Sequence, residues 1–301
     1  MNLPLNVPFG LGEMLSVGCA LAWAIAVILF KKSGESLPPF ALNFFKNMVG
    51  LVLLGATILA LNGPHLPPIP AAALPLILLS GFLGIAAGDT LYFRALNAIG
   101  AGRIAVAQTL YSPFVIGLSL LFLGEHLDTL QFCGVALVLC GIVLVTYVRD
   151  RNHPDARALR LGVLTAILSV LLMAVGVVMA KPMLEHHDFL WVVWLRTAGG
   201  FAGMCVVVAV RGNAAQLRQA YGRVRHWPQV IGGSVMGNYI SMMLWLGGYK
   251  YTRASIAAVL NETAAVFIVI FAVMFLHERV SARQVMGVVL AVCGVVMVVS
   301  L

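Results

Sequence analysis

The sequence predicts an all-helical integral membrane protein, with ten transmembrane helices arranged as two inverted five-helix repeats. Its composition, a series of ten apolar stretches and an internal duplication predict this fold. Of its 301 residues, 61% are hydrophobic and only 10% are charged, and the mean hydropathy is +0.99. A water-exposed surface normally needs about a quarter of all residues to be charged. Lipid is therefore expected to surround most of this chain.

Ten apolar stretches follow one another along the chain, and each is expected to be a membrane-spanning helix. A helix that crosses about 30 Å of hydrocarbon needs about 20 apolar residues, and helix satisfies its own backbone hydrogen bonds in lipid. Prolines at Leu37-Pro38-Pro39 and Lys181-Pro182 predict the ends of the first and sixth spans. The stretches are 11–30, 40–61, 73–96, 102–123, 129–148, 160–180, 190–210, 228–249, 254–276 and 283–301.

The second half of the chain repeats the first. An offset of 150 residues pairs Lys46 with Arg196. An offset of 153 residues superposes Tyr92 on Trp245, Glu125 on Glu278, Gly134 on Gly287 and Gly141 on Gly294. Five spans per half is an odd number, so the second copy must cross the membrane in the opposite direction. We expect a first repeat over 1–148, a cytoplasmic linker over 149–159 and a second, inverted repeat over 160–301.

The distribution of basic residues predicts the orientation in the membrane. Of the 19 lysines and arginines, fifteen fall on the side that carries the odd-numbered connections. The other side carries the remaining four, which are Lys181, Arg196, Lys250 and Arg253. Because cytoplasmic loops are rich in Lys and Arg, we expect a multi-pass protein of the inner (plasma) membrane with both termini on the non-cytoplasmic side. The net charge of +8 is then a topology signal, and no nucleic-acid partner is expected.

Several short segments resemble the EamA family of the drug/metabolite transporter superfamily. They are Arg103-Ile-Ala-Val-Ala-Gln-Thr-Leu-Tyr-Ser-Pro113, Leu121-Phe-Leu-Gly-Glu125, Arg253-Ala-Ser-Ile-Ala-Ala258 and Phe275-Leu-His-Glu278. The resemblance covers nearly the whole chain. It implies ten helices, inverted repeats around a central cavity, and export or exchange of metabolites such as amino acids. The segments 21–33, 134–141 and 287–294 also resemble the first and last helices of the small multidrug resistance proteins, but Trp23 stands where those carriers have a proton-binding glutamate.

Carboxyl groups inside predicted spans are candidate sites, because burying an ionisable group in hydrocarbon costs roughly 2.5–3.5 kcal/mol. Glu262 lies near the middle of the ninth span, beside Asn261. It is expected either to serve transport or to form a plain buried hydrogen bond. Asp89, in the third span, is expected either to load and release a proton as a cavity wets, or to be a structural partner of Arg94 or Arg103.

Lys46 and Arg196 are expected either to snorkel towards the headgroups or to bind a substrate carboxylate. Uncharged polar side chains offer donors and acceptors that would orient a polar ligand. Those on the fourth and eighth spans are Gln108, Thr109, Tyr111, Ser112, Asn238, Tyr239 and Ser241. Three aromatic residues are expected either to wall the cavity or to belong to interfacial belts, namely Trp23, Tyr92 and Trp245.

The remaining features concern helix ends and packing. Glu125 and Glu278 end the fourth and ninth spans at equivalent positions, where cap or gate contacts are expected. Gly134 and Gly141, with their repeat mates, are expected to let the fifth and tenth spans approach closely.

A secondary active transporter is the function that these features favour, with proton-coupled export of small polar metabolites such as amino acids. No HExxH, GxSxG or phosphate-binding glycine loop occurs, so no enzymatic activity is expected. No cofactor or metal is expected either. Two alternatives remain, an uncoupled facilitator or exchanger and a non-transporting membrane sensor or assembly protein. The expected partners are a small-molecule substrate, protons and the lipid bilayer, and the expected state is a monomer or a homodimer.

Overall fold

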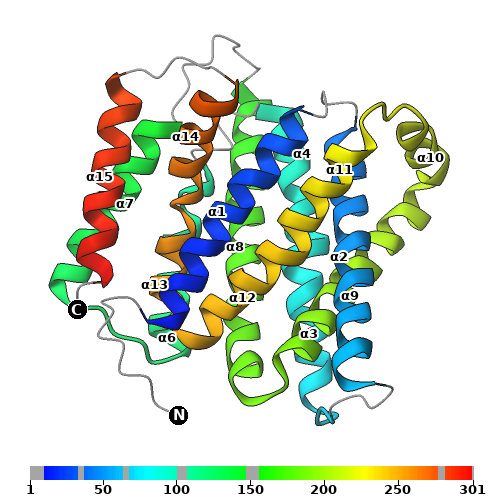
Figure 1. Cartoon of the computed structure of the whole chain (residues 1–301), viewed down its shortest axis with the longest axis horizontal. Helices are drawn as coiled ribbons and strands as arrows, with labels where there is room; N and C mark the ends of the chain where they lie inside the picture. The colour runs from blue at the N-terminus through cyan, green and yellow to red at the C-terminus, as the bar shows by residue number, and fades with distance from the viewer. Residues whose placement is uncertain are drawn as a thin grey trace.

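The computed structural model describes residues 10–32, 37–63, 68–99, 107–146, 156–276 and 282–299. All regular elements in these ranges are helices, and they lie side by side in one bundle (Figure 1). Six of them are long and apolar enough to cross a membrane: Leu11–Phe30, Phe40–Asn62, Ala73–Tyr92, Leu159–His186, Phe189–Arg211 and Trp227–Tyr251. Four shorter apolar helices accompany them: Tyr111–Phe122, Thr129–Leu144, Ala254–Ile268 and Val285–Val299.

The first half of the chain begins with α1 and α2. Pro38 is the N-cap of α2 and Pro39 its first residue, a position where the missing N–H of proline costs nothing. The third apolar stretch is one helical segment whose middle, η1, has wider π-helical turns. The elements are α1 (Leu11–Lys32), α2 (Pro39–Asn62), α3 (Ala73–Gly81), η1 (Phe82–Gly88), α4 (Asp89–Ile99), α6 (Tyr111–Phe122) and α7 (Thr129–Thr146).

The second half follows the same pattern, and its described residues include the additional short helix α10. The residues equivalent to α13 in the first half, 101–108, lie mostly outside the described ranges. The elements are α8 (Ala156–His186), α9 (Phe189–Arg211), α10 (Ala214–Gly222), α11 (Trp227–Ser234), η2 (Val235–Ile240), α12 (Ser241–Tyr251), α13 (Ala254–Asn261), α14 (Ala264–Leu276) and α15 (Ala282–Val299). Each of the ten predicted apolar stretches therefore contains helix within its described residues.

Irregular backbone recurs at equivalent places in the two halves. The π-helical segments η1 and η2 begin at Phe82 and Val235, which the offset of 153 residues superposes. A turn at Thr109 precedes α6, and a turn at its counterpart Glu262 separates α13 from α14. Single π turns inside helices frequently mark functional sites. The duplication thus extends from the sequence to the local distortions of the helices.

The glycine spacing that is repeated in the two halves brings α7 and α15 into close contact. A Cβ atom on Gly134 would lie 2.8 Å from the carbonyl oxygen of Gly294, and one on Gly294 would lie 2.6 Å from that of Gly134. Further along, a Cβ on Gly141 would lie 2.5 Å from the oxygen of Gly287. These crossed pairs require the two helices to run in opposite directions. The glycines therefore serve packing within one chain, as expected for small residues between membrane helices.

The two ends of the bundle differ in what they carry. The start of α1 and the end of α15 lie at the same end (Figure 1), together with the connections at 123–128, 187–188 and 252–253. We call this end the terminal face. The opposite end carries α10, and we call it the α10 face. A shared face for the two helix ends agrees with an even number of crossings, while the cytoplasmic side stays a prediction.

One expectation about a helix end was wrong, and two predicted connections contain helix. The Lys181-Pro182 pair does not close the sixth span, because α8 continues through Pro182 to His186. A proline this close to the end of a helix removes only one of its hydrogen bonds. The connection between the predicted spans 190–210 and 228–249 contains a helix, α10, which buries Leu217 and Ala220. α8 also begins at Ala156, inside the predicted linker.

Candidate functional site

A buried network of amide groups surrounds Asp89. Asn43 on α2 donates to Asp89 Oδ2 at 2.8 Å, and Asn47 donates to Asn43 Oδ1 at 3.0 Å. Asn238 in η2 donates in turn to Asn47 Oδ1 at 3.3 Å. The three asparagines are 1–2% exposed. This network joins α2, α4 and η2 through side chains that belong to both halves of the chain. Asn43 and Asn47 were not among the predicted site residues.

Asp89 has partners that differ from the expected ones. Lys46 on α2 and Arg196 on α9 are charged neighbours of Asp89, and Asn43 donates a hydrogen bond to its carboxylate. Arg94, which was expected to pair with it, lines a pocket at the α10 face, and Arg103 lies outside the described residues. Among the described residues, Asp89 is therefore hydrogen-bonded to an amide group of α2.

The two repeat-related cations each lie over an indole ring. Lys46 Nζ is 5.1 Å from the ring centre of Trp23, and Arg196 Cζ is 5.2 Å from that of Trp245. Such contacts attract a cation to the electron-rich face of the ring. Arg196 is 1% exposed and therefore does not snorkel. Its helix is held against α3, since a Cβ on Gly81 would lie only 1.8 Å from the carbonyl oxygen of Arg196.

A pair of tyrosines lies beside Arg196. The hydroxyl groups of Tyr111 on α6 and Tyr249 on α12 are 2.9 Å apart, and both tyrosines are electrostatic neighbours of the guanidinium group. Nε and Nη1 of Arg196 are buried and have no hydrogen-bond partner within the described part of the chain. Tyr249 is fully buried. Tyr249 was not among the predicted site residues, because a tyrosine at the end of a span usually belongs to an interfacial belt.

Glu262 lies at the turn between α13 and α14. Its Oε1 accepts a hydrogen bond of 3.2 Å from Ser112 Oγ on α6. The neighbouring Asn261 has both side-chain polar atoms buried without a partner among the described residues. Tyr111 and Tyr249 are electrostatic neighbours of Glu262 as well as of Arg196. The structure thus brings together residues from α6, α9, α12 and the α13–α14 turn. We call this group, which consists of Tyr111, Ser112, Arg196, Tyr249 and Glu262, the polar centre.

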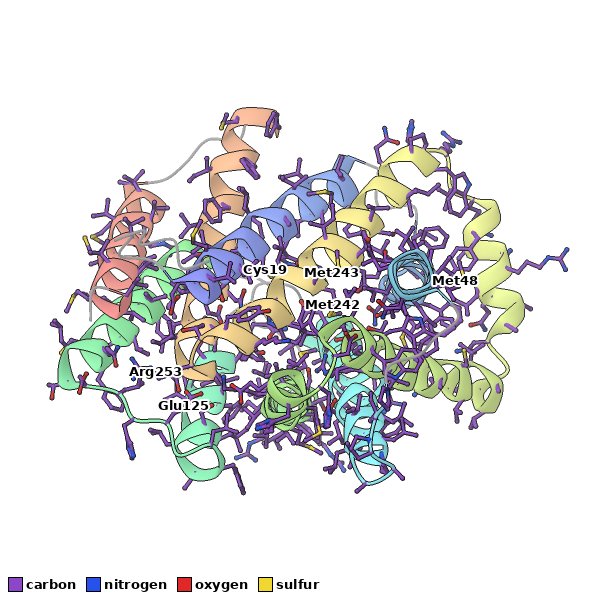
Figure 2. The ribbon with its side chains drawn as sticks, turned by 60° about the horizontal axis from the view of Figure 1, so that its bottom comes forward. Cys19, Met48, Glu125, Met242, Met243 and Arg253 are labelled. Atoms are coloured by element: carbon purple, nitrogen blue, oxygen red, sulfur yellow. The ribbon has the colours of Figure 1, made fainter. Side chains whose placement is uncertain are left out.

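The other predicted residues make contacts elsewhere. Tyr92 and Gln108 share a side-chain hydrogen bond. The Tyr239 hydroxyl is 2.6 Å from that of Thr57 on α2. Thr109 is buried at 9% exposure. Near the centre, Cys19 Sγ on α1 lies 3.4 Å from Ser241 Oγ, and Figure 2 shows Cys19 close to Met242 and Met243 of α12 in this view.

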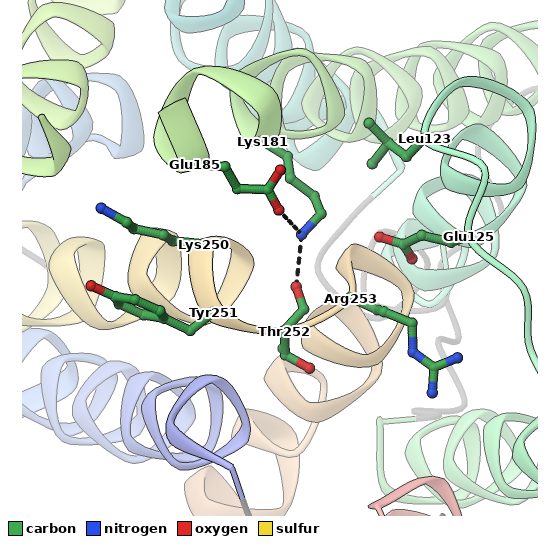
Figure 3. Close-up of a pocket in the computed structure, with 8 residues that line it drawn as sticks. All are labelled: Leu123, Glu125, Lys181, Glu185, Lys250, Tyr251, Thr252 and Arg253. Carbon is green, nitrogen blue, oxygen red and sulfur yellow. Dashed lines mark hydrogen bonds and ion pairs between the residues drawn. The ribbon is translucent and has the colours of Figure 1, made fainter. Parts of the chain in front are cut away.

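A pocket of about 490 Å³ opens at the terminal face (Figure 3). On one side, Lys181 Nζ donates to the carbonyl oxygens of Tyr249 at 2.9 Å and Thr252 at 2.8 Å, and pairs with Glu185 at 2.8 Å. Tyr249 therefore connects this pocket, through its carbonyl group, with the polar centre, through its hydroxyl group. The lining residues are Leu123, Glu125, Lys181, Glu185, Lys250, Tyr251, Thr252 and Arg253.

Glu125 fastens α6 to α13 at the edge of this pocket. Its carboxylate accepts hydrogen bonds from the backbone N–H groups of Ala254 at 2.6 Å and Ser255 at 3.0 Å, and from the Ser255 hydroxyl at 2.7 Å. These N–H groups begin α13 and have no partner inside the helix. The expected cap contact of Glu125 is thus present, whereas Glu278 lies outside the described residues.

A second pocket, of about 210 Å³, opens at the α10 face. Thr90, which follows Asp89, lines it together with Arg94 and residues of α2 and α10. The two pockets lie at opposite ends of the bundle, and polar side chains occupy the region between them.

The residues described here contain no group of three His, Cys, Asp or Glu side chains that would suit a metal ion. Asp188, in the His186-His187-Asp188 run, caps α9 by accepting from the Trp191 N–H at 2.8 Å.

Comparison with known proteins agrees with the fold. A transporter of Archaeoglobus fulgidus, described as uncharacterized, is 20% identical over 284 residues, which cover 94% of this chain and 96% of that protein. The uncharacterized transporter YdfC of Bacillus subtilis is 26% identical over 193 residues, covering 64% of this chain and 60% of its own length. A solved structure, titled only as the crystal structure of a protein, superposes with a TM-score of 0.76 at 18% identity and covers 95% of both chains.

The model of the EamA-like transporter family matches twice, over residues 10–147 and over residues 160–300. Each match covers one of the two repeated halves. The two together account for nearly the whole chain, and the protein belongs to the EamA-like transporter family.

Proposed function

We propose that this protein is a secondary active transporter that exports small polar metabolites, such as amino acids, in exchange for protons. In this proposal ten membrane-spanning helices form two inverted five-helix repeats, and the substrate passes between them. Membership of a transporter family and the transporter names of its relatives support the general activity. The polar centre supports the finer assignment of substrate and coupling.

The observation that carries the proposal is the position of Glu262. Its carboxyl group lies in an interrupted apolar helix and has one hydrogen-bond partner among the described side chains, Ser112. A hydroxyl group donates to an ionised carboxylate and accepts from a protonated one, so Glu262 can change its protonation state without losing Ser112. Interrupted helices commonly carry the ion sites of secondary transporters. A carboxyl group inside a membrane-spanning helix that serves no function would only add a free-energy cost of insertion.

The second carboxyl group is assigned a different role. Asp89 is held by Asn43 and lies next to Lys46. We therefore assign proton coupling to Glu262, and we assign Asp89 to the organisation of the pathway near the α10 face.

Alternating access follows from the same arrangement. The pockets at the terminal face and at the α10 face are candidate entrances to one pathway, and Tyr249 and Asp89 mark its two inner ends. Two related halves of opposite orientation can give two packings of similar energy, each open to one side. In this structure the Glu125 contact holds the terminal-face end of α13 to α6.

Flux measurements in proteoliposomes test the coupling. Vesicles containing the purified protein are loaded in turn with each of the standard amino acids in labelled form, and an inward proton gradient is imposed. We expect the gradient to accelerate efflux of a subset of them. Glu262→Gln should abolish this acceleration while downhill flux continues, and Glu185→Gln, at the rim of the terminal-face pocket, should retain it.

Three results would contradict the proposal in different ways. A wild-type flux that ignores the pH step would indicate an uncoupled facilitator. A Glu262→Gln variant that still responds to the step would remove Glu262 from the coupling. The absence of flux for every amino acid tested, in correctly folded protein, would favour a non-transporting membrane protein.

We further propose that the protein lies in the inner membrane with both termini outside the cytoplasm. The excess of basic residues on one side and the common face of the two helix ends support this orientation. A C-terminal alkaline phosphatase fusion should be active and a C-terminal green fluorescent protein fusion dark. The reverse pattern would overturn the orientation.

A further inference from the structure

Arg196 is a buried charge, and two of its three guanidinium nitrogen atoms have no hydrogen-bond acceptor among the described residues. The side chain is 1% exposed, and its Nε and Nη1 atoms are buried without partners. Proteins pair or hydrogen-bond their buried charges, because an isolated charge in a low-dielectric interior is costly. The indole of Trp245 covers the guanidinium group from one side but accepts no N–H hydrogen bond in its plane. The N–H groups of Nε and Nη1 therefore have no hydrogen-bond acceptor among the described side chains and backbone.

The repeat shows where an internal acceptor would be. In the first half, Lys46 has the carboxylate of Asp89 as its nearest charged neighbour. The offset that superposes Tyr92 on Trp245 also superposes Asp89 on Met242, so the second half has a thioether where the first half has a carboxylate. Asp89 does act on Arg196 electrostatically, but its Oδ2 accepts from Asn43 instead. The second half therefore has no carboxylate at the position equivalent to Asp89.

A glycine and two tyrosine hydroxyl groups adjoin the guanidinium group of Arg196. Position 84 is a glycine, and a Cβ atom there would lie 3.0 Å from Arg196 Nη2. The hydroxyl groups of Tyr111 and Tyr249 lie on another side as a pair 2.9 Å apart. A guanidinium group offers five N–H donors in a planar fork that matches a carboxylate.

We propose that Arg196 binds the carboxylate group of the transported substrate, so that the substrate is a small carboxylate-bearing molecule. The proposal rests on the proposed transport function and specifies its substrate class. The substrate supplies the counter-ion that Met242 does not, and Trp245 together with the Tyr111–Tyr249 pair orients it. We do not assign this role to Lys46, because its own half of the chain supplies a carboxylate, Asp89, that acts on it.

Binding to the full-length protein in detergent tests the proposal independently of flux. The probes are the standard L-amino acids and a set of simple mono- and dicarboxylates, each compared with its own carboxamide, by thermal stabilisation and titration. We expect some carboxylates to bind and their uncharged amides to bind at least about 10-fold more weakly, as expected for loss of hydrogen bonds to a charged group. Arg196→Met should weaken carboxylate binding by about 10- to 100-fold and leave amide binding unchanged.

Two further variants separate ligand binding from a structural role. Without ligand, Arg196→Met should melt at or above the wild-type temperature, because replacing an unpaired buried charge by an apolar group removes its desolvation cost. Met242→Asp should restore an internal counter-ion, raise the melting temperature of the empty protein and suppress carboxylate binding. Met242→Leu should behave as wild type.

The outcomes are distinguishable. Failure of every carboxylate to bind, equal binding of carboxylates and amides, or unchanged carboxylate binding in Arg196→Met would overturn the carboxylate site. A marked loss of stability in Arg196→Met would assign the side chain to folding instead. Carboxylate binding that depends on Arg196, in a protein that moves none of the bound compounds across vesicles, would support the site and contradict the transport function.

Discussion

Removing the Glu125 carboxylate should destabilise the terminal face strongly. This side chain is 8% exposed and accepts three hydrogen bonds, two from the first backbone N–H groups of α13 and one from the Ser255 hydroxyl. Carboxylates at a helix N-terminus also interact favourably with the helix dipole. In Glu125→Ala the two backbone donors lose their acceptor in a buried position.

The expected loss can be estimated from these contacts. A hydrogen bond to a charged group contributes about 1.5–3 kcal/mol. The Ser255 hydroxyl can rotate to another acceptor, and neighbouring contributions are not additive. The two N–H groups then dominate, and we expect Glu125→Ala to lower the free energy of unfolding by about 3–5 kcal/mol. Glu185 provides a matched control in the same pocket, since its ion pair with Lys181 is 38% exposed on the glutamate side. Pairs of this kind contribute about 0.3–0.5 kcal/mol.

Thermal unfolding of the purified variants, followed by tryptophan fluorescence in one detergent, provides the assay. A change of 1 kcal/mol moves the midpoint by about 2–4 °C in domains of 150–250 residues. Glu125→Ala should therefore melt about 6–20 °C lower, and Glu185→Ala less than about 2 °C lower. Equal shifts for the two variants would refute the reasoning, because the buried cap would then contribute no more than an exposed ion pair.

Two further predictions concern packing and helix ends. Gly294→Ala would place a Cβ atom 2.6 Å from the carbonyl oxygen of Gly134 and should destabilise the protein by about 1–3 kcal/mol. Gly117 is the control, because the space around its new Cβ atom is open. In the same unfolding assay, Gly117→Ala should be neutral or stabilising by up to about 1 kcal/mol. Lys181→Met leaves the carbonyl oxygens of Tyr249 and of Thr252, the C-cap of α12, without their hydrogen-bond donor. We therefore expect faster amide hydrogen exchange in the last turn of α12. An unchanged exchange rate would contradict this capping role of Lys181.

Much of the helical fold could be predicted from the sequence because lipid restricts the alternatives. An apolar stretch in hydrocarbon has to satisfy its own backbone, so hydropathy alone places helix in each stretch. Hydropathy does not register where a helix loosens or ends. It missed the π-helical turns at Phe82 and Val235, the continuation of α8 beyond Pro182, and the short helix around Leu217. These features depend on packing against neighbouring helices rather than on local composition.

The candidate site was predictable in its charges but not in its partners. Glu262, Asp89 and Arg196 stand out in any apolar span because their insertion is costly. Asn43 could have been noticed as a polar residue close to Lys46, although only the fold shows that it meets Asp89. Tyr249 gave no signal, because its burial depends on the way in which α12 packs in the bundle.

The close contact between α7 and α15 constrains how the molecule can move. One helix of each half is locked to the other by backbone atoms that meet at Gly134 and Gly294. The halves consequently cannot rock apart as two rigid blocks. A motion that opens the bundle must then bend or slide the other helices relative to the α7–α15 pair. The π-helical turns of η1 and η2 are the expected hinges for such bending.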